Sequence, residues 1–292
     1  MTPSWRSGFV IGEDDVRLFY ETCSSGTPML LFDGLFCNGH VWKYFIPHFC
    51  DRNQIVHWHY PGHGKSSSPS ITGELSIARL SRDALAVMEL LNLHDAVLVG
   101  HSLGVQVVLE MAWRFPSKVR GMVLLCGAPG QVVKTFHDSR VMEAVLPLLG
   151  VGTRFIPRQF SSLWRLLPMN LVANVVRRSD EINRRLIDME DLMPYFDGMT
   201  RTDINVATRL LEQADHHDMM PVLSQIDIPA LVVAGKKDRF TPSYRSRQMA
   251  DALPRAELLI SEEGTHSLPL EQPDLVNLAI DDFLAKYLFI HK

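Results

Sequence analysis

A serine with a glycine two residues away on either side stands at the centre of Gly100-His101-Ser102-Leu103-Gly104. A serine hydroxyl is a weak nucleophile at neutral pH and becomes reactive when an adjacent base removes its proton. An apolar run at 96–99 precedes the stretch and predicts a strand, and apolar residues spaced for one helix face follow it from 105 to 113. This context is typical of a nucleophile elbow, whose tight turn pushes the hydroxyl out of the sheet edge. The two glycines give that turn room.

An acid and a base follow further along the chain, each after an apolar run. Asp238 comes after the predicted strand 229–234, and His266 lies in a loop after the run 256–260 and before a helix that begins near Pro273. In open α/β sheets, functional sites gather beyond the carboxyl ends of the strands. With the chain order Ser102, Asp238, His266, the histidine would act as base for the serine, and the aspartate would fix the imidazole tautomer.

The rest of the chain must provide the sheet that positions these residues. Two strands, near 9–13 and 16–21, are predicted to form a hairpin around Asp14-Asp15. Apolar runs and helical segments then alternate to about Cys126, with a helix predicted over 77–91, and the alternation resumes at Pro229. This rhythm predicts a mostly parallel sheet.

The interval from about 131 to 220 breaks the rhythm. It contains no convincing strand, and its apolar spacing predicts helical patches at 141–149, 165–176, 181–193 and 204–215. The interval therefore predicts a helical insertion between two core strands.

With these motifs the sequence resembles the α/β-hydrolase superfamily over nearly its whole length. The resemblance rests on G-H-S-L-G at 100–104, G-K-K-D-R-F-T-P at 235–242 and G-T-H-S-L-P-L-E-Q-P-D at 264–274. It implies an α/β-hydrolase fold, which is a mostly parallel sheet with helices on both faces and an inserted helical cap. It also implies a core domain of residues 1–130 and 221–292, a cap of residues 131–220, and an esterase-like or lactonase-like activity.

The resemblance extends to the groups around the serine. The backbone N–H groups of Leu35 and Leu103 would form the oxyanion hole, which stabilises the negative charge that develops on the substrate. Trp42 matches a common position of the family, and we expect it to line the substrate pocket together with Phe36 and Trp164. A cap over Ser102 must expose apolar surface to the cleft, which favours an apolar acyl or alcohol group in the substrate.

Two positions depart from the family's usual pattern in opposite directions. The oxyanion loop usually begins His-Gly but here contains Asp33-Gly34, and the strand that usually ends in Asp has His59 at that place. We expect Asp33 and His59 to form a pair with reversed polarity, which would hold the oxyanion loop. The alternative is that the two substitutions are unrelated.

These observations predict a serine hydrolase that cleaves a small or medium, largely apolar carboxylic ester or lactone through an acyl-Ser102 intermediate. A C–C bond hydrolase, an acyltransferase and a perhydrolase use the same triad and remain alternatives. A ligand-binding or signalling protein of the same fold with slow turnover is an alternative from another class. A serine at position 102 argues against the epoxide hydrolases and dehalogenases of this fold, which have an aspartate there.

The composition limits the number of domains, the partners and the compartment that we expect. The chain has 292 residues, of which 46% are hydrophobic, and a net charge of −4, so we expect one large α/β domain with no overall charge signature of nucleic-acid or membrane binding. The first ten residues lack the apolar core of a signal peptide, and no apolar run is long enough to span a bilayer. We expect a cytoplasmic protein with a small-molecule substrate, and the oligomeric state stays open. The cysteines show no paired spacing and predict free thiols: Cys23, Cys37, Cys50 and Cys126.

Two groups of histidines invite a metal interpretation. His57, His59 and His63 lie close in sequence, but the familiar two-metal hydrolase pattern needs an aspartate at 60–62, where this chain has Tyr-Pro-Gly. Adjacent histidines such as His216-His217 diverge by about 100° on a helix and rarely bind one ion together. We therefore expect no metal and no cofactor.

Overall fold

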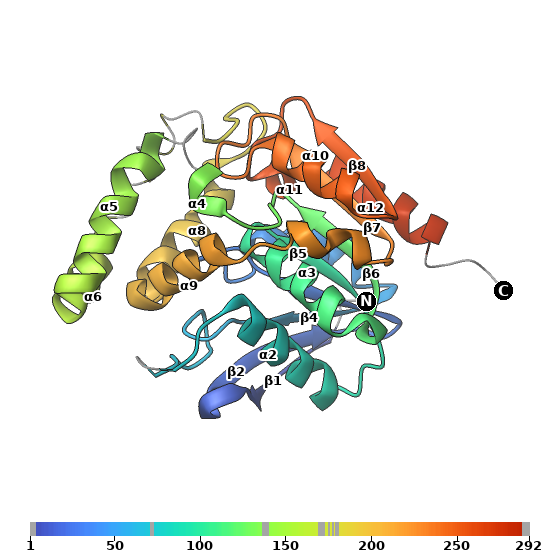
Figure 1. Ribbon diagram of the computed structural model, residues 1–292, viewed down its shortest axis with the longest axis horizontal. Coiled ribbons are helices and arrows are strands. Elements are labelled where there is room, and N and C mark those ends of the chain that lie inside the picture. Colours follow the sequence, from blue (N-terminus) through green and yellow to red (C-terminus); the bar gives the residue numbers. More distant parts are fainter. Residues whose placement is uncertain are drawn as a thin grey trace.

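An eight-stranded sheet forms the centre of the structure (Figure 1). The structure is a computed structural model, and it describes residues 4–70, 73–135, 140–168, 173–174, 176, 178 and 181–287. The strands stand in the order β1-β2-β4-β3-β5-β6-β7-β8. Their bounds are Trp5–Ile11 (β1), Arg17–Cys23 (β2), Thr27–Phe32 (β3), Asn53–Trp58 (β4), Ala96–His101 (β5), Val119–Leu125 (β6), Ala230–Gly235 (β7) and Ala256–Ser261 (β8).

The sheet is mostly parallel, as the sequence predicts. Strand β2 pairs antiparallel with β1 and β4, whereas every pairing from β4 through β8 is parallel. The predicted N-terminal hairpin is present, although both of its strands extend beyond the predicted ranges. A short 3-10 helix at Glu13–Asp15 makes the connection, in which Asp14 and Asp15 have positive φ angles of 53° and 57°.

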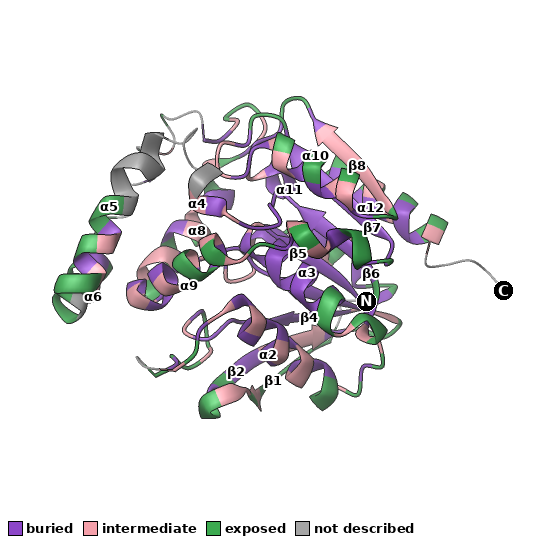
Figure 2. Ribbon diagram, viewed as in Figure 1, coloured by how far each residue is buried: buried purple, intermediate pink, exposed green. Residues whose placement is uncertain are grey.

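Helices cover both faces of the sheet because its central strands are apolar on both sides. In β5, Ala96 and Leu98 face one core cluster, and Val97 and Val99 face the other. The first cluster packs against α2 (Ile77–Leu90), α3 (Leu103–Arg114) and α10 (Ser243–Ala252), and the second against α1 (Phe45–Phe49) and α12 (Pro273–Tyr287). Figure 2 shows the buried strands between these layers. Shorter elements are η2 (His40–Trp42), η3 (Pro116–Lys118) and α11 (Leu268–Glu271).

In the described residues, the chain between β6 and β7 forms helices joined by turns and bends, with one isolated β-bridge and no strand. Its helices are α4 (Val132–Thr135), α5 (Arg140–Phe155), α6 (Pro157–Arg165), α8 (Met189–Arg201), α9 (Ile204–His216) and the 3-10 helix η5 (Met220–Gln225). Helix α9 matches the predicted patch 204–215, and its N-cap Asp203 accepts a hydrogen bond from the Asn205 amide at 3.0 Å.

Two predicted helices of this segment are corrected. A helix was predicted to begin at residue 165, but α6 ends at Arg165, so the start of the predicted patch 165–176 is wrong. Part of the remaining patch lies outside the described residues. The patch 181–193 is helical only from Met189, because bends and turns occupy 181–186. A distant contact holds that turn: the Asn183 amide donates to Glu271 Oε1 at 2.8 Å. Tertiary structure therefore overrides the local apolar spacing.

The two ends of this segment lie side by side. Gly130 and Asp218 form the isolated antiparallel bridge, and the Met219 amide donates to the Pro129 carbonyl at 2.9 Å. His217 places its two ring nitrogens 2.9 Å from Gln106 Oε1 and 3.1 Å from Glu110 Oε2, which ties the returning chain to α3. The division into a core and a cap of residues 131–220 stays a prediction.

Two further expectations concern the chain as a whole. No helix in the described ranges combines the length and the apolar character needed to cross a membrane. All four cysteines are free, as the sequence predicts, and all four are buried.

Candidate active site

Ser102 occupies a strained turn between β5 and α3. Its φ and ψ angles are 55° and −116°, a left-handed φ that residues other than glycine rarely adopt. The glycines on either side are required by close contacts. A Cβ atom on Gly100 would lie 2.6 Å from the Gly104 carbonyl oxygen, and one on Gly104 would lie 2.2 Å from the Phe32 carbonyl oxygen. The turn therefore accepts no side chain at either position without a backbone shift.

The structure brings together the three side chains that the sequence singles out. Ser102 Oγ lies 2.9 Å from His266 Nε2, and His266 Nδ1 lies 2.8 Å from Asp238 Oδ2. Asp238 is buried, while the His266 side chain is 18% exposed. The histidine thus stands between the hydroxyl and a carboxylate removed from solvent, an arrangement that can pass a proton from the serine to the ring.

The Asp238 carboxylate is fixed by its own loop. Its Oδ1 atom accepts hydrogen bonds from the Phe240 and Thr241 amides at 2.9 and 2.8 Å. The Thr241 hydroxyl lies 2.8 Å from both Asp238 Oδ2 and the Cys126 carbonyl oxygen. These contacts point Oδ2 at the imidazole.

Two further side chains hold the His266 loop. His101 Nε2 lies 3.0 Å from the His266 carbonyl oxygen, so that nitrogen is the donor. Burial, with a smaller effect from His266, lowers the pKa of His101 to about 3 and keeps its ring neutral. Glu271 accepts from the Thr265 amide and hydroxyl at 2.7 and 2.6 Å. The sequence reasoning missed Thr241, His101 and Glu271, although all three stand inside the three quoted motifs.

The loop after β3 lies against the serine. A Cβ atom on Gly34 would be 3.1 Å from Ser102 Cβ, so the next residue, Leu35, begins close to Ser102. Leu103 begins α3, and the first N–H groups of a helix have no acceptor within the helix. Both predicted oxyanion donors therefore belong to backbone segments adjacent to Ser102.

Asp33 anchors this loop. Its Oδ1 atom accepts from Trp42 Nε1 at 2.7 Å, and Oδ2 accepts from the Gly39 amide at 2.9 Å and from His57 Nε2 at 3.0 Å. Burial alone would raise the pKa of Asp33, but the positive charge and hydrogen bond of His57 hold it below its usual value. The loop is thus fastened to a charged carboxylate with three donors.

The predicted partner of Asp33 was wrong: it is His57 and not His59. Leu31 on β3 stands opposite His57 on β4, so a straight continuation would place Asp33 opposite His59. However, β3 ends at Phe32, and the Asp33 side chain turns to His57. His59 instead accepts from the Lys65 amide at 2.9 Å through Nδ1. Burial and the nearby charge of His57 lower the pKa of His59 to about 4.

Glu21, His57 and His59 form the group that most resembles a metal site in the described chain, with ligand atoms within 4.8 Å of one another. His57 faces carboxylates through both nitrogens, with Nδ1 at 3.3 Å from Glu21 Oε1. Burial opposes a charge on His57, but Asp33 and Glu21 raise its pKa to about 9, so both nitrogens carry protons. His59 accepts at Nδ1, which leaves its proton on Nε2. The donors and acceptors therefore favour an ion cluster over a cation site.

The three predicted pocket residues differ in their surroundings. Trp42 is fully buried in the core against Phe45 and donates to Asp33, so its assignment to the substrate pocket was wrong. Phe36 and Trp164 pack in one apolar cluster with Leu149, which joins the oxyanion loop to the inserted helices. Phe36 has a positive φ of 67°. A pocket role for Phe36 and Trp164 stays a prediction.

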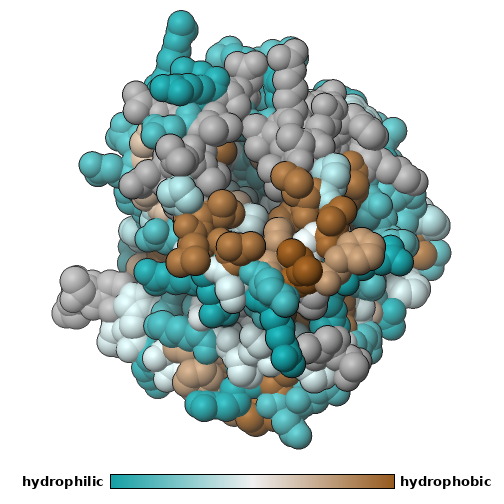
Figure 3. All heavy atoms as spheres, turned by 90° about the vertical axis from the view of Figure 1, so that its left-hand side faces the viewer, coloured by the Kyte–Doolittle hydropathy of each residue, from teal (hydrophilic) through white to brown (hydrophobic). Residues whose placement is uncertain are grey.

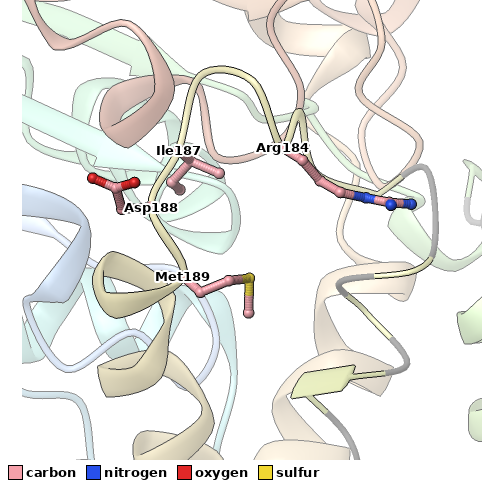
Figure 4. A pocket seen from close by; sticks show the side chains of 4 residues that line it. All are labelled: Arg184, Ile187, Asp188 and Met189. Carbon is pink, nitrogen blue, oxygen red and sulfur yellow. The ribbon is translucent and has the colours of Figure 1, made fainter.

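A separate cavity of about 340 Å³ is lined by Arg184, Ile187, Asp188 and Met189. In Figure 4, Arg184 and Asp188 point to opposite sides of it. Its lining contains none of the predicted site residues, so the hydrogen-bonded groups at Ser102 define the candidate site.

Comparison with known proteins identifies the fold family. A family model described as the alpha/beta hydrolase fold matches residues 27–273. The chain is 27% identical over 266 residues to a putative carbamate hydrolase RutD of Azorhizobium caulinodans, covering 90% of this chain and 93% of the relative. It is 29% identical over 238 residues to a pimeloyl-acyl-carrier-protein methyl ester esterase of Methylococcus capsulatus, covering 82% and 85%.

A solved structure of similar fold is the enol-lactonase from Burkholderia xenovorans. It matches with a TM-score of 0.76 and 19% identity over 95% of this chain and 100% of that chain. The fold class predicted from the sequence is confirmed.

Proposed function

Because the chain belongs to the family of the alpha/beta hydrolase fold, we propose that it is a serine hydrolase that cleaves a small or medium, largely apolar carboxylic ester or lactone. The observation that carries the proposal is the hydrogen-bonded series from Ser102 Oγ through His266 to Asp238. It supplies the nucleophile, base and orienting carboxylate that acyl transfer to serine requires.

The reaction follows from these positions. His266 Nε2 takes the Ser102 proton as Oγ attacks the carbonyl carbon of the substrate, and the same proton then goes to the leaving alkoxide. The acyl group stays on Ser102 until a water molecule, activated by His266, attacks it and releases the acid. Asp238 keeps the Nδ1 proton in place and stabilises the transient imidazolium.

The negative charge on the carbonyl oxygen needs donors that are already oriented. We assign this role to the backbone N–H groups of Leu35 and Leu103, beside Ser102. Asp33 would repel such a charge if its carboxylate turned toward the substrate. Its three donors, His57 Nε2, Trp42 Nε1 and the Gly39 amide, fix both oxygens elsewhere.

The inserted segment 131–220 serves, in this proposal, as a cap on the core formed by 1–130 and 221–292. Two contacts support this placement: a Cβ on Gly198 would lie 2.3 Å from the Phe36 carbonyl oxygen, and Phe36 packs with Leu149 and Trp164. These apolar side chains favour an apolar substrate group. The names of the relatives include a methyl ester esterase, an enol-lactonase and a putative carbamate hydrolase, all of which imply acyl substrates.

The test is turnover of p-nitrophenyl esters from acetate to octanoate, and of simple lactones, with labelling by a fluorophosphonate probe. We expect multiple turnovers, with label and activity both lost in Ser102→Ala and both retained in the control Ser117→Ala, which changes an exposed serine. Equal ester hydrolysis by Ser102→Ala and the unchanged protein would overturn the proposal. Stoichiometric acylation without turnover would favour a binding or signalling protein instead.

A further inference from the structure

The α5–α6 hairpin exposes an apolar face to solvent. Figure 3 shows hydrophobic atoms gathered on the side of the molecule that carries these two helices. We call this the outer face, and its residues are Leu148, Val151, Phe155, Ile156, Leu163, Leu166 and Leu167. Leu148, Phe155 and Leu166 are 67%, 71% and 77% exposed, so most of the surface of these side chains is left in contact with solvent. Such a concentration of large apolar side chains marks an interaction surface.

The opposite side of the hairpin already has its partners. Leu149 and Trp164 are buried against Phe36, Ile204 and Ala207. Along α5 the outer residues 148, 151 and 155 keep helical spacing, with about one turn between each and the next. The hairpin is thus apolar on both sides, a pattern typical of helices that are buried all round. Among the described residues, partners are found for one side only.

The charges of the hairpin indicate what covers the outer face. From Pro147 to Pro168 the sequence contains three arginines and no acidic residue, although the whole chain carries −4. Arg154, Arg158 and Arg165 are all exposed. Apolar residues accompanied by basic ones are typical of segments that lie in a membrane interface. The whole-chain charge conceals this local positive charge.

We propose that the outer face docks on an anionic lipid surface. Its apolar side chains would enter the boundary between headgroups and acyl chains, and the three arginines would contact phosphate groups. Helix α5 has 16 residues and α6 has 9, and both are shorter than the roughly 20 needed to cross a bilayer. The hairpin therefore lies on the surface.

A second copy of the chain fits this face less well. Dimers most often form around a two-fold axis, where each patch meets itself. The hairpin would then bring arginines together without an acidic residue between 147 and 168 to pair with them. An anionic bilayer satisfies the apolar and the basic groups at once.

The test is flotation of the full-length protein with vesicles of phosphatidylcholine alone and of phosphatidylcholine rich in phosphatidylglycerol. It needs no catalytic turnover, so its result is independent of the proposed function. We expect binding to the anionic vesicles that weakens as salt is raised. The double variant Leu148→Ser with Leu166→Ser should bind at least roughly tenfold more weakly, because it removes two large apolar groups that would enter the lipid boundary. Each of Arg158→Ala and Arg165→Ala should weaken binding about fivefold at low salt.

The matched control is Leu278→Ser, which changes a leucine of α12 that is 60% exposed and not on the hairpin. It should bind vesicles like the unchanged protein, and far-ultraviolet circular dichroism should be the same for all variants. Absence of binding by the unchanged protein, or equal binding by the Leu148/Leu166 variant, would refute lipid docking. A dimer in light scattering that the Leu148/Leu166 variant converts to a monomer would also refute it and assign the face to a second copy.

Discussion

His57 Nε2 lies 3.0 Å from Asp33 Oδ2, and both residues are buried. The ring bridges two carboxylates, since its Nδ1 faces Glu21 Oε1 at 3.3 Å. A buried negative charge close to the proposed oxyanion loop is thereby compensated by a buried positive one. The position of this loop therefore depends on the positive charge of His57 on β4.

The first prediction concerns the anchor of that loop. Asp33→Ala should lower kcat by roughly ten- to a hundredfold, because three donors lose their acceptor and the oxyanion donors lose their alignment. Steady-state kinetics with a p-nitrophenyl ester would measure the loss. The control Asp227→Ala removes an exposed carboxylate and should leave kcat unchanged. An unaltered kcat in a folded Asp33→Ala protein would show that the loop needs no anchor.

The second prediction concerns pH and stability. Asp33 and Glu21 raise the pKa of His57 to about 9 against the opposing effect of burial, whereas an unfolded histidine titrates near roughly 6.5. The stabilisation is complete below the unfolded value and is lost as pH rises from about 6.5 through about 9. Urea unfolding should show a decline in the free energy of unfolding over this window. His57→Gln, which keeps a donor without the charge, should remove that part of the decline, and equal slopes would contradict the prediction.

A third prediction tests the proposed orienting carboxylate. Asp238→Asn should lower kcat by about four orders of magnitude, because an amide at this place favours the wrong tautomer of His266. Asp251→Asn changes an exposed aspartate of α10 and serves as the matched control. A loss of less than about tenfold would mean that another group orients the histidine.

The fourth prediction separates two roles of Thr241. Thr241→Val removes the hydroxyl that lies 2.8 Å from Asp238 Oδ2, and kcat should fall by about tenfold, the value of one hydrogen bond to a charged group. Thr241→Ser keeps the hydroxyl and should restore kcat. Unchanged kcat in Thr241→Val would refute the positioning role, because valine keeps the shape of threonine and lacks only the hydroxyl.

Glycine positions in two helices allow a fifth prediction. Gly104→Ala should cost about 2 kcal/mol or more of stability, because the new Cβ atom would lie 2.2 Å from the Phe32 carbonyl oxygen. At Gly150 a Cβ atom meets nothing within 4 Å. Gly150→Ala should therefore stabilise the protein by about 0.5–1 kcal/mol through helix propensity. Thermal unfolding of the two variants should shift in opposite directions.

The features predicted correctly from the sequence are those that the local spacing of apolar residues determines. Apolar runs place the central strands, and the residues after them, Ser102, Asp238 and His266, meet because parallel strands end at one edge of the sheet. Helix α9 was predicted for a similar reason, since its apolar spacing and its contacts agree.

The errors arose where distant contacts decide. The helix expected from residue 181 is a turn up to residue 186, where the Asn183 amide binds Glu271 across the chain. Trp42 lies in the core, where its ring nitrogen donates a hydrogen bond to Asp33. Two reciprocal departures from the family's pattern suggested His59 as the partner of Asp33, but a sequence does not show where a strand stops and a side chain turns back.

The bridge between Gly130 and Asp218 brings the two ends of the helical insertion together at one place. Because the chain leaves the core and returns to it at adjacent residues, an insertion of a different length or content requires no change in the order or register of the strands. Replacing this segment would therefore leave the sheet unchanged. Under the two proposals above, such a replacement would alter the substrate pocket and the lipid-docking face together, since the proposed cap and the α5–α6 hairpin both lie in it.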